Sequence, residues 1–420
     1  MPASPSTARA INDRLALRLL QQEGPLTAGQ LKQLTGLSRP TVADLVERLT
    51  ASGLITVVGE SGEQRRGPNA RLYGIVADRA HLAALDVRTE SVAVAVSDLL
   101  GREPAEACVP IGGGTGTGPA VEQAVTLVER VAEEAGARRL HTVGIGAPGL
   151  IDPVTGELRN STGLPEWHRR LVAALQERLP SARVIVENET NLAALAEQRD
   201  GAALGRDTFV LLWLGHGTGA AVVLDGTLRR GASGGAGEIG FLPVPGTGAL
   251  PSATDCTGGF HSLAGAAAVV ELAREHGLSC PETGREPAAA ELVRHAVTAC
   301  ASPADASPAD VSLADAARAA RFLDALADRV ALGAASVVAL LDPGCVVLGG
   351  EVGQAGGDVL AARVAERVSR MAPLPTEVRP STLGGGAVLR GALLTARDRA
   401  QDELFAPPGA PAHPAPSPGG

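Results

Sequence analysis

Short apolar segments alternate with longer segments of helical character along most of the chain, and this alternation restricts the possible folds more than any other sequence feature. The series begins near His81 with strands over Leu82–Val87 and Ser91–Ser97 and a third strand near Cys108–Ile111. Further strand candidates are Thr142–Gly146, Arg183–Glu187, Phe209–Leu214, Ala220–Leu224 and Cys345–Leu348. Strands that alternate with helices are typical of an α/β domain, and 420 residues are enough for two or three domains.

The N-terminal segment follows a different pattern, three short helices and then two strands. The second helix opens at Thr27 with a capping box and turns Leu31 and Leu34 inward, and the third opens at Ser38. A buried stripe at helical spacing runs along the third helix, made of Val42, Leu45, Val46 and Leu49. This order is that of a winged helix-turn-helix, so we predict a DNA-binding domain over residues 1–76.

The third helix is the predicted reader of DNA. A recognition helix offers its first turn to base edges in the major groove, and Arg39 in that turn can pair with a guanine edge or a phosphate. The predicted DNA-contacting residues are Thr27, Ser38, Arg39, Thr41, Val42, Arg48, Arg65 and Arg66. Residues 1–75 hold nine basic and six acidic side chains, whereas the rest of the chain holds 28 and 40. The alternatives are a helical bundle for protein contacts and, for Arg65 and Arg66, solvated loop charges.

Two glycine-rich stretches invite a nucleotide-binding interpretation. The stretch Gly112–Gly118 lacks the Gly-Lys-Ser/Thr end of a phosphate-binding loop, so we interpret it as a connector. The stretch Gly215–Gly219 lies between two strands rather than between a strand and a helix, so it does not match the dinucleotide fingerprint. Glycines in a turn between strands suit the close approach of backbone to a phosphate or another ligand.

The part of the chain that follows the N-terminal domain, residues 80–398, is called the body. Six of its motifs resemble, in the same order, the signatures of the ROK family (repressors, open reading frames and sugar kinases). They are Gly144–Asp152, Val186–Glu197, Gly215–Gly219, Gly231–Gly240, Leu341–Gly350 and Ser381–Gly384. With the helix-turn-helix head, the chain resembles the xylose-repressor-like regulators of that family. The resemblance implies an actin-like, ribonuclease-H-like pair of α/β lobes with a cleft between them, which we place at residues 80–200 and 201–398, the last helix returning to the first lobe. The Pro- and Gly-rich tail, 406–420, is expected to be disordered.

The residues that the family uses for phosphoryl transfer are altered here. The first phosphate loop, normally Asp-x-Gly-Gly-Thr, keeps Asp86 but has Arg88 and Glu90 in the following positions. The base position carries Glu189 instead of Asp, which moves the carboxylate by one methylene. The resemblance implies ligand-binding roles for Asn188, Glu189, Glu238 and Gly149. We therefore predict a degenerate kinase site without phosphoryl-transfer activity and without a cofactor.

The zinc loop of the family is also incomplete. Its His is replaced by Phe241, and of its three cysteines only Cys256 remains, near Asp255 and His261. One thiol and a displaced imidazole do not supply four tetrahedral ligands, so no structural metal is expected. The five cysteines are odd in number and form no C-x-x-C pair, which indicates a reducing compartment.

These observations predict a transcriptional regulator, a repressor of carbohydrate-related genes, that binds a double-stranded DNA operator as a homodimer or homotetramer. A small sugar is the expected effector, and a body used only for dimerisation or for a protein partner stays an alternative. A second alternative is an ATP-dependent sugar kinase with an appended helix-turn-helix. The N-terminus lacks the apolar core of a signal peptide and no stretch of 18 apolar residues occurs, so we expect a cytoplasmic protein without a membrane span.

Overall fold

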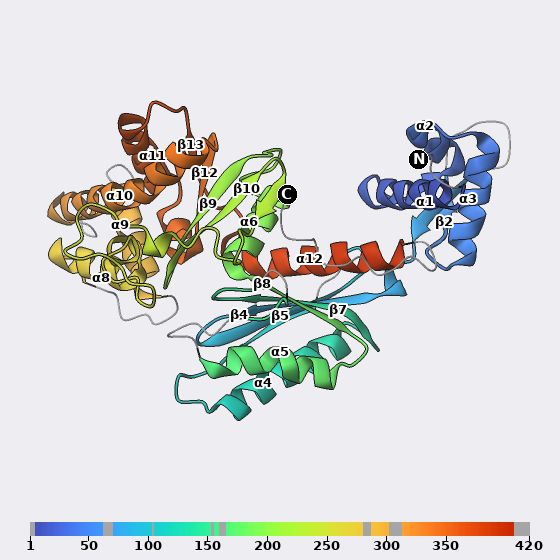
Figure 1. Ribbon diagram of the computed structural model, residues 1–420, viewed down its shortest axis with the longest axis horizontal. Helices are drawn as coiled ribbons and strands as arrows, with labels where there is room; N and C mark the ends of the chain where they lie inside the picture. The colour runs from blue at the N-terminus through green and yellow to red at the C-terminus, as the bar shows by residue number, and fades with distance from the viewer. Residues whose placement is uncertain are drawn as a thin grey trace. The chain divides into compact units, whose positions relative to one another are not determined.

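The computed structural model describes residues 5–61, 70–102, 105–152, 155–158, 165–279, 287–301 and 313–406 (Figure 1). The predicted contacts Arg65 and Arg66 and the tail from residue 407 lie outside these ranges. Within them the chain is mixed α/β, as the alternation of apolar segments predicted. No described helix combines the length and hydropathy that crossing a membrane requires.

The head has the predicted order of helices and strands. Its elements are α1 (Pro5–Gln22), β1 (Leu26–Thr27), α2 (Ala28–Thr35), α3 (Arg39–Ala51), β2 (Ile55–Glu60) and β3 (Arg71–Ile75). The capping box is confirmed, because Gln30 N donates to Thr27 Oγ1 while the Gln30 side chain accepts from Thr27 N. The predicted stripe of α3 is buried, but the inward placement of Leu34 was wrong: α2 ends one residue later, and Leu34 is 50% exposed. The two-residue β1 joins the wing, giving a three-stranded sheet of order β1-β3-β2.

The next sheet has five strands in the order β6-β5-β4-β7-β8. The strands are β4 (His81–Val87), β5 (Ser91–Asp98), β6 (Ala105–Pro110), β7 (Leu140–Ala147) and β8 (Arg183–Asn188). Strands β4, β5 and β6 form an antiparallel meander. Helices α4 (Thr117–Glu134) and α5 (Glu166–Arg178) lie on one face of this sheet (Figure 1). The strand predictions over residues 82–111, 142–146 and 183–187 are thereby confirmed to within a few residues.

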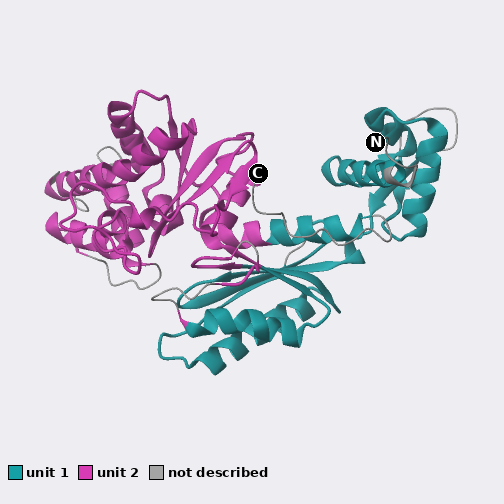
Figure 2. Cartoon of the chain, viewed as in Figure 1, with its two compact units in different colours: residues 1–145, 166–185, 393–417 teal, residues 146–165, 186–392, 418–420 magenta. Residues whose placement is uncertain are grey.

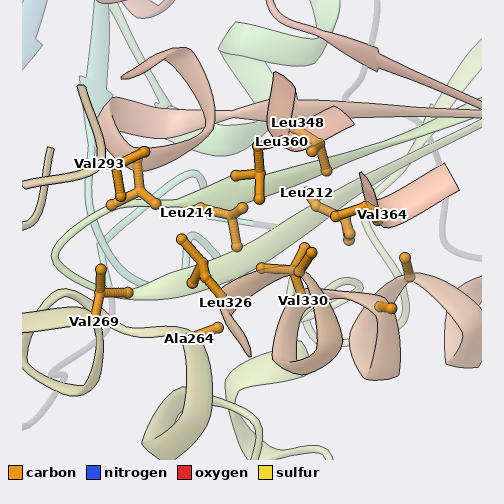
Figure 3. Packing of buried hydrophobic residues seen from close by; sticks show 14 of the residues in the cluster. Leu212, Leu214, Ala264, Val269, Val293, Leu326, Val330, Leu348, Leu360 and Val364 are labelled. Atoms are coloured by element: carbon orange, nitrogen blue, oxygen red, sulfur yellow. The ribbon is translucent and has the colours of Figure 1, made fainter. Parts of the chain in front are cut away.

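A second five-stranded sheet has the order β11-β10-β9-β12-β13. Its strands are β9 (Phe209–Leu214), β10 (Thr218–Leu224), β11 (Thr227–Arg229), β12 (Cys345–Gly349) and β13 (Glu377–Pro380). The helices of this region are α6 (Glu189–Asp200), α7 (His261–Ala264), α8 (Ala266–Glu275), α9 (Ala288–Ala301), α10 (Leu313–Leu341) and α11 (Gly350–Met371). Leu212 and Leu348 from adjacent strands, with Leu326, Val330 and Leu360 from α10 and α11, belong to one fully buried core cluster (Figure 3).

The chain divides into two compact units (Figure 2). Unit 1 contains the chain up to Ile145, Glu166–Ile185 and the segment from Leu393. Unit 2 contains Gly146–Pro165 and Val186–Ala392. The last helix, α12 (Ala387–Leu404), begins in unit 2 and ends in unit 1. Domain boundaries near residues 76, 80 and 200 stay a prediction.

Candidate ligand-binding cavity and DNA-binding helix

Asn188 ends β8 and caps the N-terminus of α6. Its Oδ1 accepts hydrogen bonds from the backbone N–H groups of Thr190 at 2.8 Å and Asn191 at 3.3 Å. Its Nδ2 donates to the carbonyl oxygen of Gly149 at 3.0 Å. The first N–H groups of a helix have no partner within the helix, so this side chain fixes where α6 begins and ties it to the segment after β7. An amide nitrogen carries two hydrogens, and one therefore remains for a ligand.

Glu187, one residue earlier, is a buried anchor that sequence reasoning missed. Its Oε1 accepts from Asn188 N at 3.0 Å and from Asn191 Nδ2 at 2.9 Å, and its Oε2 lies 2.6 Å from Arg230 Nε. The Glu187 side chain is 9% exposed and that of Arg230 is 44% exposed. The ion pair joins the start of α6 to the loop after β11. Glu187 lies inside a motif quoted for the family, but Arg230 belongs to no pattern that would single it out.

Two glycines allow the loops to meet closely beside α6. Gly237 has a φ of +91°, and its carbonyl oxygen accepts from Ala220 N at 2.8 Å. A Cβ at Gly237 would collide with the backbone carbonyl of Ala220 in β10. A Cβ at Gly219 would lie 3.4 Å from Thr190 Oγ1, so β10 approaches the first turn of α6 as well. Only glycine suits position 237, on grounds of both space and backbone conformation.

These loops enclose a cavity of about 140 Å³ that lies wholly in unit 2. The lining residues are Gly149, Asn188, Glu189, Thr190, Asn191, Trp213, Gly217, Thr218, Gly219, Ala220, Gly234, Ala236, Gly237 and Glu238. The structure thus brings together all four residues that sequence analysis proposed as ligand-binding, and their role in binding stays a prediction. Pockets for drug-sized ligands measure about 300–1,000 Å³, so this cavity is smaller than a typical drug-binding pocket.

The carboxyl group of Glu238 has a perturbed pKa. Loss of solvation around its carboxylate raises the pKa of Glu238 above the usual range for a glutamate. The residue as a whole is exposed, so the desolvation acts on the carboxyl group that lines the cavity rather than on the entire side chain. A carboxyl group in this position can accept hydrogen bonds from the hydroxyl groups of a ligand.

In the altered first phosphate loop, which lies in unit 1, the side chains of Asp86 and Arg88 form an ion pair. Arg88 Nε and Nη2 lie 3.0 Å and 2.9 Å from Oδ2 of Asp86. Asp86 is 3% exposed. In the family pattern the positions after this Asp are glycines, whose backbone a phosphate can approach. Here Arg88 folds over the carboxylate, so its guanidinium is committed to Asp86.

The glycine turn Gly215–Gly219, between β9 and β10, carries a second obstruction. A Cβ at Gly215 would collide with the carboxylate of Glu351, the second residue of α11. The carboxylate therefore lies directly against the glycine turn, at a helix N-terminus where an anionic ligand would otherwise be favoured. This negative charge opposes the binding of a phosphate at the turn.

The remnants of the zinc loop do not assemble into a ligand set. The described residues contain no cluster of three or more His, Cys, Asp or Glu side chains that could hold a metal ion. Asp255 Oδ1 instead accepts from Thr257 N at 2.9 Å and from Thr257 Oγ1 at 2.8 Å. Cys256 and His261 are the thiol and the imidazole that remain near the zinc-loop position. Burial raises the pKa of the Cys256 thiol and lowers the pKa of the His261 imidazole.

Six of the eight predicted DNA contacts lie in the part of the chain that the structure describes. Ser38 and Arg39 are exposed and Thr41 is half-buried at the start of α3, where the Ser38 and Thr41 hydroxyl groups lie 2.8 Å apart. Val42 is only 2% exposed and packs in the core of the head, so it is removed from the candidates because it has no surface to offer a base.

Thr27 and Arg48 are committed within the head. Thr27 is 8% exposed and its hydroxyl belongs to the capping box, so it is a structural residue rather than a DNA contact. Arg48 Nη2 lies 2.6 Å from Asp13 Oδ1, and Nη1 pairs with Asp44, which ties α3 to α1. The first turn of α3, which begins at Arg39, stays the predicted surface for a DNA groove.

Comparison with known protein families gives two matches. The ROK family model matches residues 84–399, and the MarR family model matches residues 11–67. A glucokinase from Halalkalibacterium halodurans is 32% identical over 59% of this chain and 74% of its own length. A xylose repressor from Caldicellulosiruptor bescii is 24% identical over 56% of this chain and 59% of its own length. This chain thus aligns with about three fifths of that repressor.

Among solved structures, one described as a ROK family transcriptional regulator, homologous to the Escherichia coli MLC protein, superposes with a TM-score of 0.71. The match covers 95% of this chain and 98% of the other, at 20% sequence identity. At that identity the likeness shows the fold alone: a winged head followed by an actin-like, two-lobed α/β body.

Proposed function

The chain belongs to the ROK family, and from this premise we propose that it is a DNA-binding transcriptional regulator, a repressor of carbohydrate-related genes, whose body binds a small sugar without phosphorylating it. The observation that carries the proposal is the exposed Arg39 at the start of α3, on a head that buries Leu31 and Leu45 in its core. The match of residues 11–67 to the MarR family supports the same function.

We propose the cavity of unit 2 as the effector site. It offers the remaining amide hydrogen of Asn188 and the carboxylates of Glu189 and Glu238 as partners for sugar hydroxyl groups. A sugar that favours one conformation of the body changes DNA affinity by the difference between its binding free energies in the two states. One recognition helix covers one half-site, so the proposed partner is a two-fold operator bound by a homodimer or a larger oligomer.

Two features argue against phosphoryl transfer. The Asp86–Arg88 pair covers the first phosphate loop, and the Glu351 carboxylate lies against the second. Phosphoryl transfer requires that both loops hold the nucleotide with Mg²⁺ and that a base lies within hydrogen-bond distance of the acceptor hydroxyl. The proposed body is therefore a sensor, and this proposal also accounts for a cavity that keeps Asn188 and Glu238.

The test of DNA binding uses fluorescence anisotropy with a labelled duplex from the region upstream of the gene and a shuffled duplex of equal length. We expect tighter binding to the upstream duplex and a loss of about 1–3 kcal/mol for Arg39→Ala on that duplex alone. The matched control is Arg138→Ala, which removes the same charge from the exposed turn after α4. Equal losses for Arg39→Ala on both duplexes would reduce Arg39 to a phosphate contact, and no binding to either duplex would refute the regulator.

A sugar kinase is the second candidate, and one observation favours it: the 32% identity with a glucokinase, together with a carboxylate, Glu189, in the cavity. A coupled assay for ADP release across neutral hexoses separates the two functions. We expect no turnover for the wild type, and none for Glu189→Asp, because the phosphate loops would still be obstructed. Robust ADP release by either protein would favour the kinase.

A further inference from the structure

Resting on the proposed effector site, we propose that the cavity selects its ligand by charge: it accepts a neutral monosaccharide, binds the corresponding amino sugar more tightly through its protonated amine, and rejects the sugar phosphate. Three observations support it: the acidic residues of the described lining, the ion pair of Arg230, and the hydrogen bonds at the N-terminus of α6.

The described part of the lining carries negative charge. Among the described residues that line the cavity, the ionisable ones are Glu189 and Glu238, and both are acidic. An anionic ligand would therefore meet two carboxylates in a confined space, where charge interactions are stronger than in bulk water.

The described cation that pairs with Glu187, just before α6, is Arg230. Arg230 Nε lies 2.6 Å from Glu187 Oε2, and Arg230 is not among the lining residues. Glu187 in turn accepts from the backbone N–H of Asn188 and the side-chain amide of Asn191. A phosphate could recruit Arg230 only by leaving the buried Glu187 carboxylate without its counter-charge, which is costly.

The helix N-terminus beside the cavity cannot serve as an anion site either. Such sites bind anions through N–H groups that lack partners. In α6 the N–H groups of Thr190 and Asn191 donate to Asn188 Oδ1, and Glu189 already places a carboxylate in the first turn. The helix dipole is thus compensated by the chain itself, and a sugar phosphate would have to displace the Asn188 cap.

Cavity size supports a single sugar ring. The volume of about 140 Å³ is less than half the lower limit of about 300 Å³ for drug-sized ligands. The ligand classes to be distinguished are therefore monosaccharides that share one ring and differ only in charge.

Isothermal titration calorimetry of the full chain provides the test, with matched trios on the glucose, galactose and mannose rings: the hexose, its 2-amino-2-deoxy derivative at a pH that keeps the amine protonated, and its 6-phosphate. For the ring that binds, we expect the amino sugar to bind at least about 10-fold more tightly than the hexose and the 6-phosphate at least about 10-fold more weakly. A tenfold change in Kd corresponds to about 1.4 kcal/mol.

Two variants assign the selectivity to the cavity. Glu238→Gln should reduce both ratios towards one, whereas Asp225→Asn, which removes the same charge from an aspartate whose side chain is 90% exposed, should leave both unchanged. The inference is overturned if the 6-phosphate binds as tightly as the hexose, if Glu238→Gln leaves the ratios intact, or if no ring binds. The same preparation is assayed on the upstream duplex. A sugar that binds without the expected charge selectivity refutes this inference alone, DNA binding without any sugar binding also refutes the proposed effector site, and loss of DNA binding refutes the proposed regulator.

Discussion

At the residue scale, the pair Glu187–Arg230 holds the cavity walls together, and its removal should destabilise the protein. Arg230→Ala leaves the buried Glu187 carboxylate without its ion-pair partner. We expect a loss of about 1–3 kcal/mol in the free energy of unfolding, less than for a fully buried pair because Arg230 is partly solvated. The control is Arg229→Ala, whose partner Asp225 is exposed and 3.5 Å away, with an expected change below about 0.5 kcal/mol. Equal losses in urea unfolding would contradict this account.

The free energy of unfolding should depend on pH through the buried His168 of unit 1. His168 is 2% exposed, its ring meets that of Trp167 edge-on at 4.2 Å between centroids, and burial lowers the pKa of His168 to about 4. In the unfolded chain a histidine has a pKa of about 6.5, so between these values the unfolded state binds the extra proton and stability falls as pH decreases.

The size of this effect follows from the two pKa values. Between pH 7 and pH 5 the His168 contribution to the free energy of unfolding should fall by about 2 kcal/mol. The variant His168→Gln removes the titrating group, so its stability should fall by about 2 kcal/mol less over the same interval. Parallel urea unfolding at both pH values measures the difference, and identical pH dependence for the two proteins would show that His168 does not titrate in this way.

At the scale of one element, the start of α3 has a structural role and a proposed DNA-binding role that can be separated. The Ser38 hydroxyl caps the helix by accepting from Thr41 N. Ser38→Ala should lower stability by about 1 kcal/mol, whereas Ser38→Asp should retain the cap. The added negative charge of Ser38→Asp should nevertheless weaken DNA binding, because it opposes the phosphate backbone. Anisotropy and thermal unfolding of both variants test this, and full DNA affinity in Ser38→Asp would place the DNA elsewhere.

The glycine loop beside the cavity provides the second element-scale prediction. Gly237→Ala introduces a Cβ that collides with the Ala220 carbonyl at a backbone φ of +91°, so we expect a loss of about 2–4 kcal/mol. In Gly217→Ala the new Cβ meets nothing within 4 Å, and the expected change is below about 1 kcal/mol. The two midpoints of urea unfolding give the comparison. Similar values would mean that the loop adjusts without cost.

Elements were predictable from sequence where local rules decide them. The Thr27 capping box, the Ser38 cap and the buried stripe of α3 depend on residues within one or two turns, and the structure contains all three. Leu34 was placed wrongly because α2 ends at the next residue, leaving no element to cover it. Val42 was predicted both to pack in the core and to contact DNA. Its side chain is buried in the structure, so it packs in the core.

The candidate site was predictable in part. The structure places all four predicted ligand-binding residues in the lining of one cavity, although they come from three separate motifs: Gly149, Asn188, Glu189 and Glu238. The Glu187–Arg230 pair was not predictable, since its members are 43 residues apart and ion pairing depends on how β11 and α6 meet. The Asp86–Arg88 pair and the placement of the Glu351 carboxylate beside Gly215 likewise depend on side-chain placement, although Arg88 already indicated a lost glycine in the first phosphate loop.

For the whole molecule, the charge distribution restricts where DNA can bind. The head is net basic, whereas the remainder of the chain carries 28 basic and 40 acidic side chains. An acidic body repels a polyanion, so contacts should be confined to the head and affinity should fall steeply as salt increases. Helix α12 is continuous from unit 2 into unit 1, and it contacts α6 so closely that a Cβ at Gly391 would collide with the backbone of Leu192.

The central claim is that this ROK protein regulates DNA binding in response to a sugar and does not phosphorylate it. The most direct measurement titrates the full chain on the labelled upstream duplex with Mg-ATP present, with and without the sugar that binds by calorimetry, while ADP is measured in the same samples. We predict sequence-dependent DNA binding whose Kd changes when the sugar is added, with no ADP above background. Sugar-dependent ADP release without any effect of the sugar on DNA affinity would contradict the account.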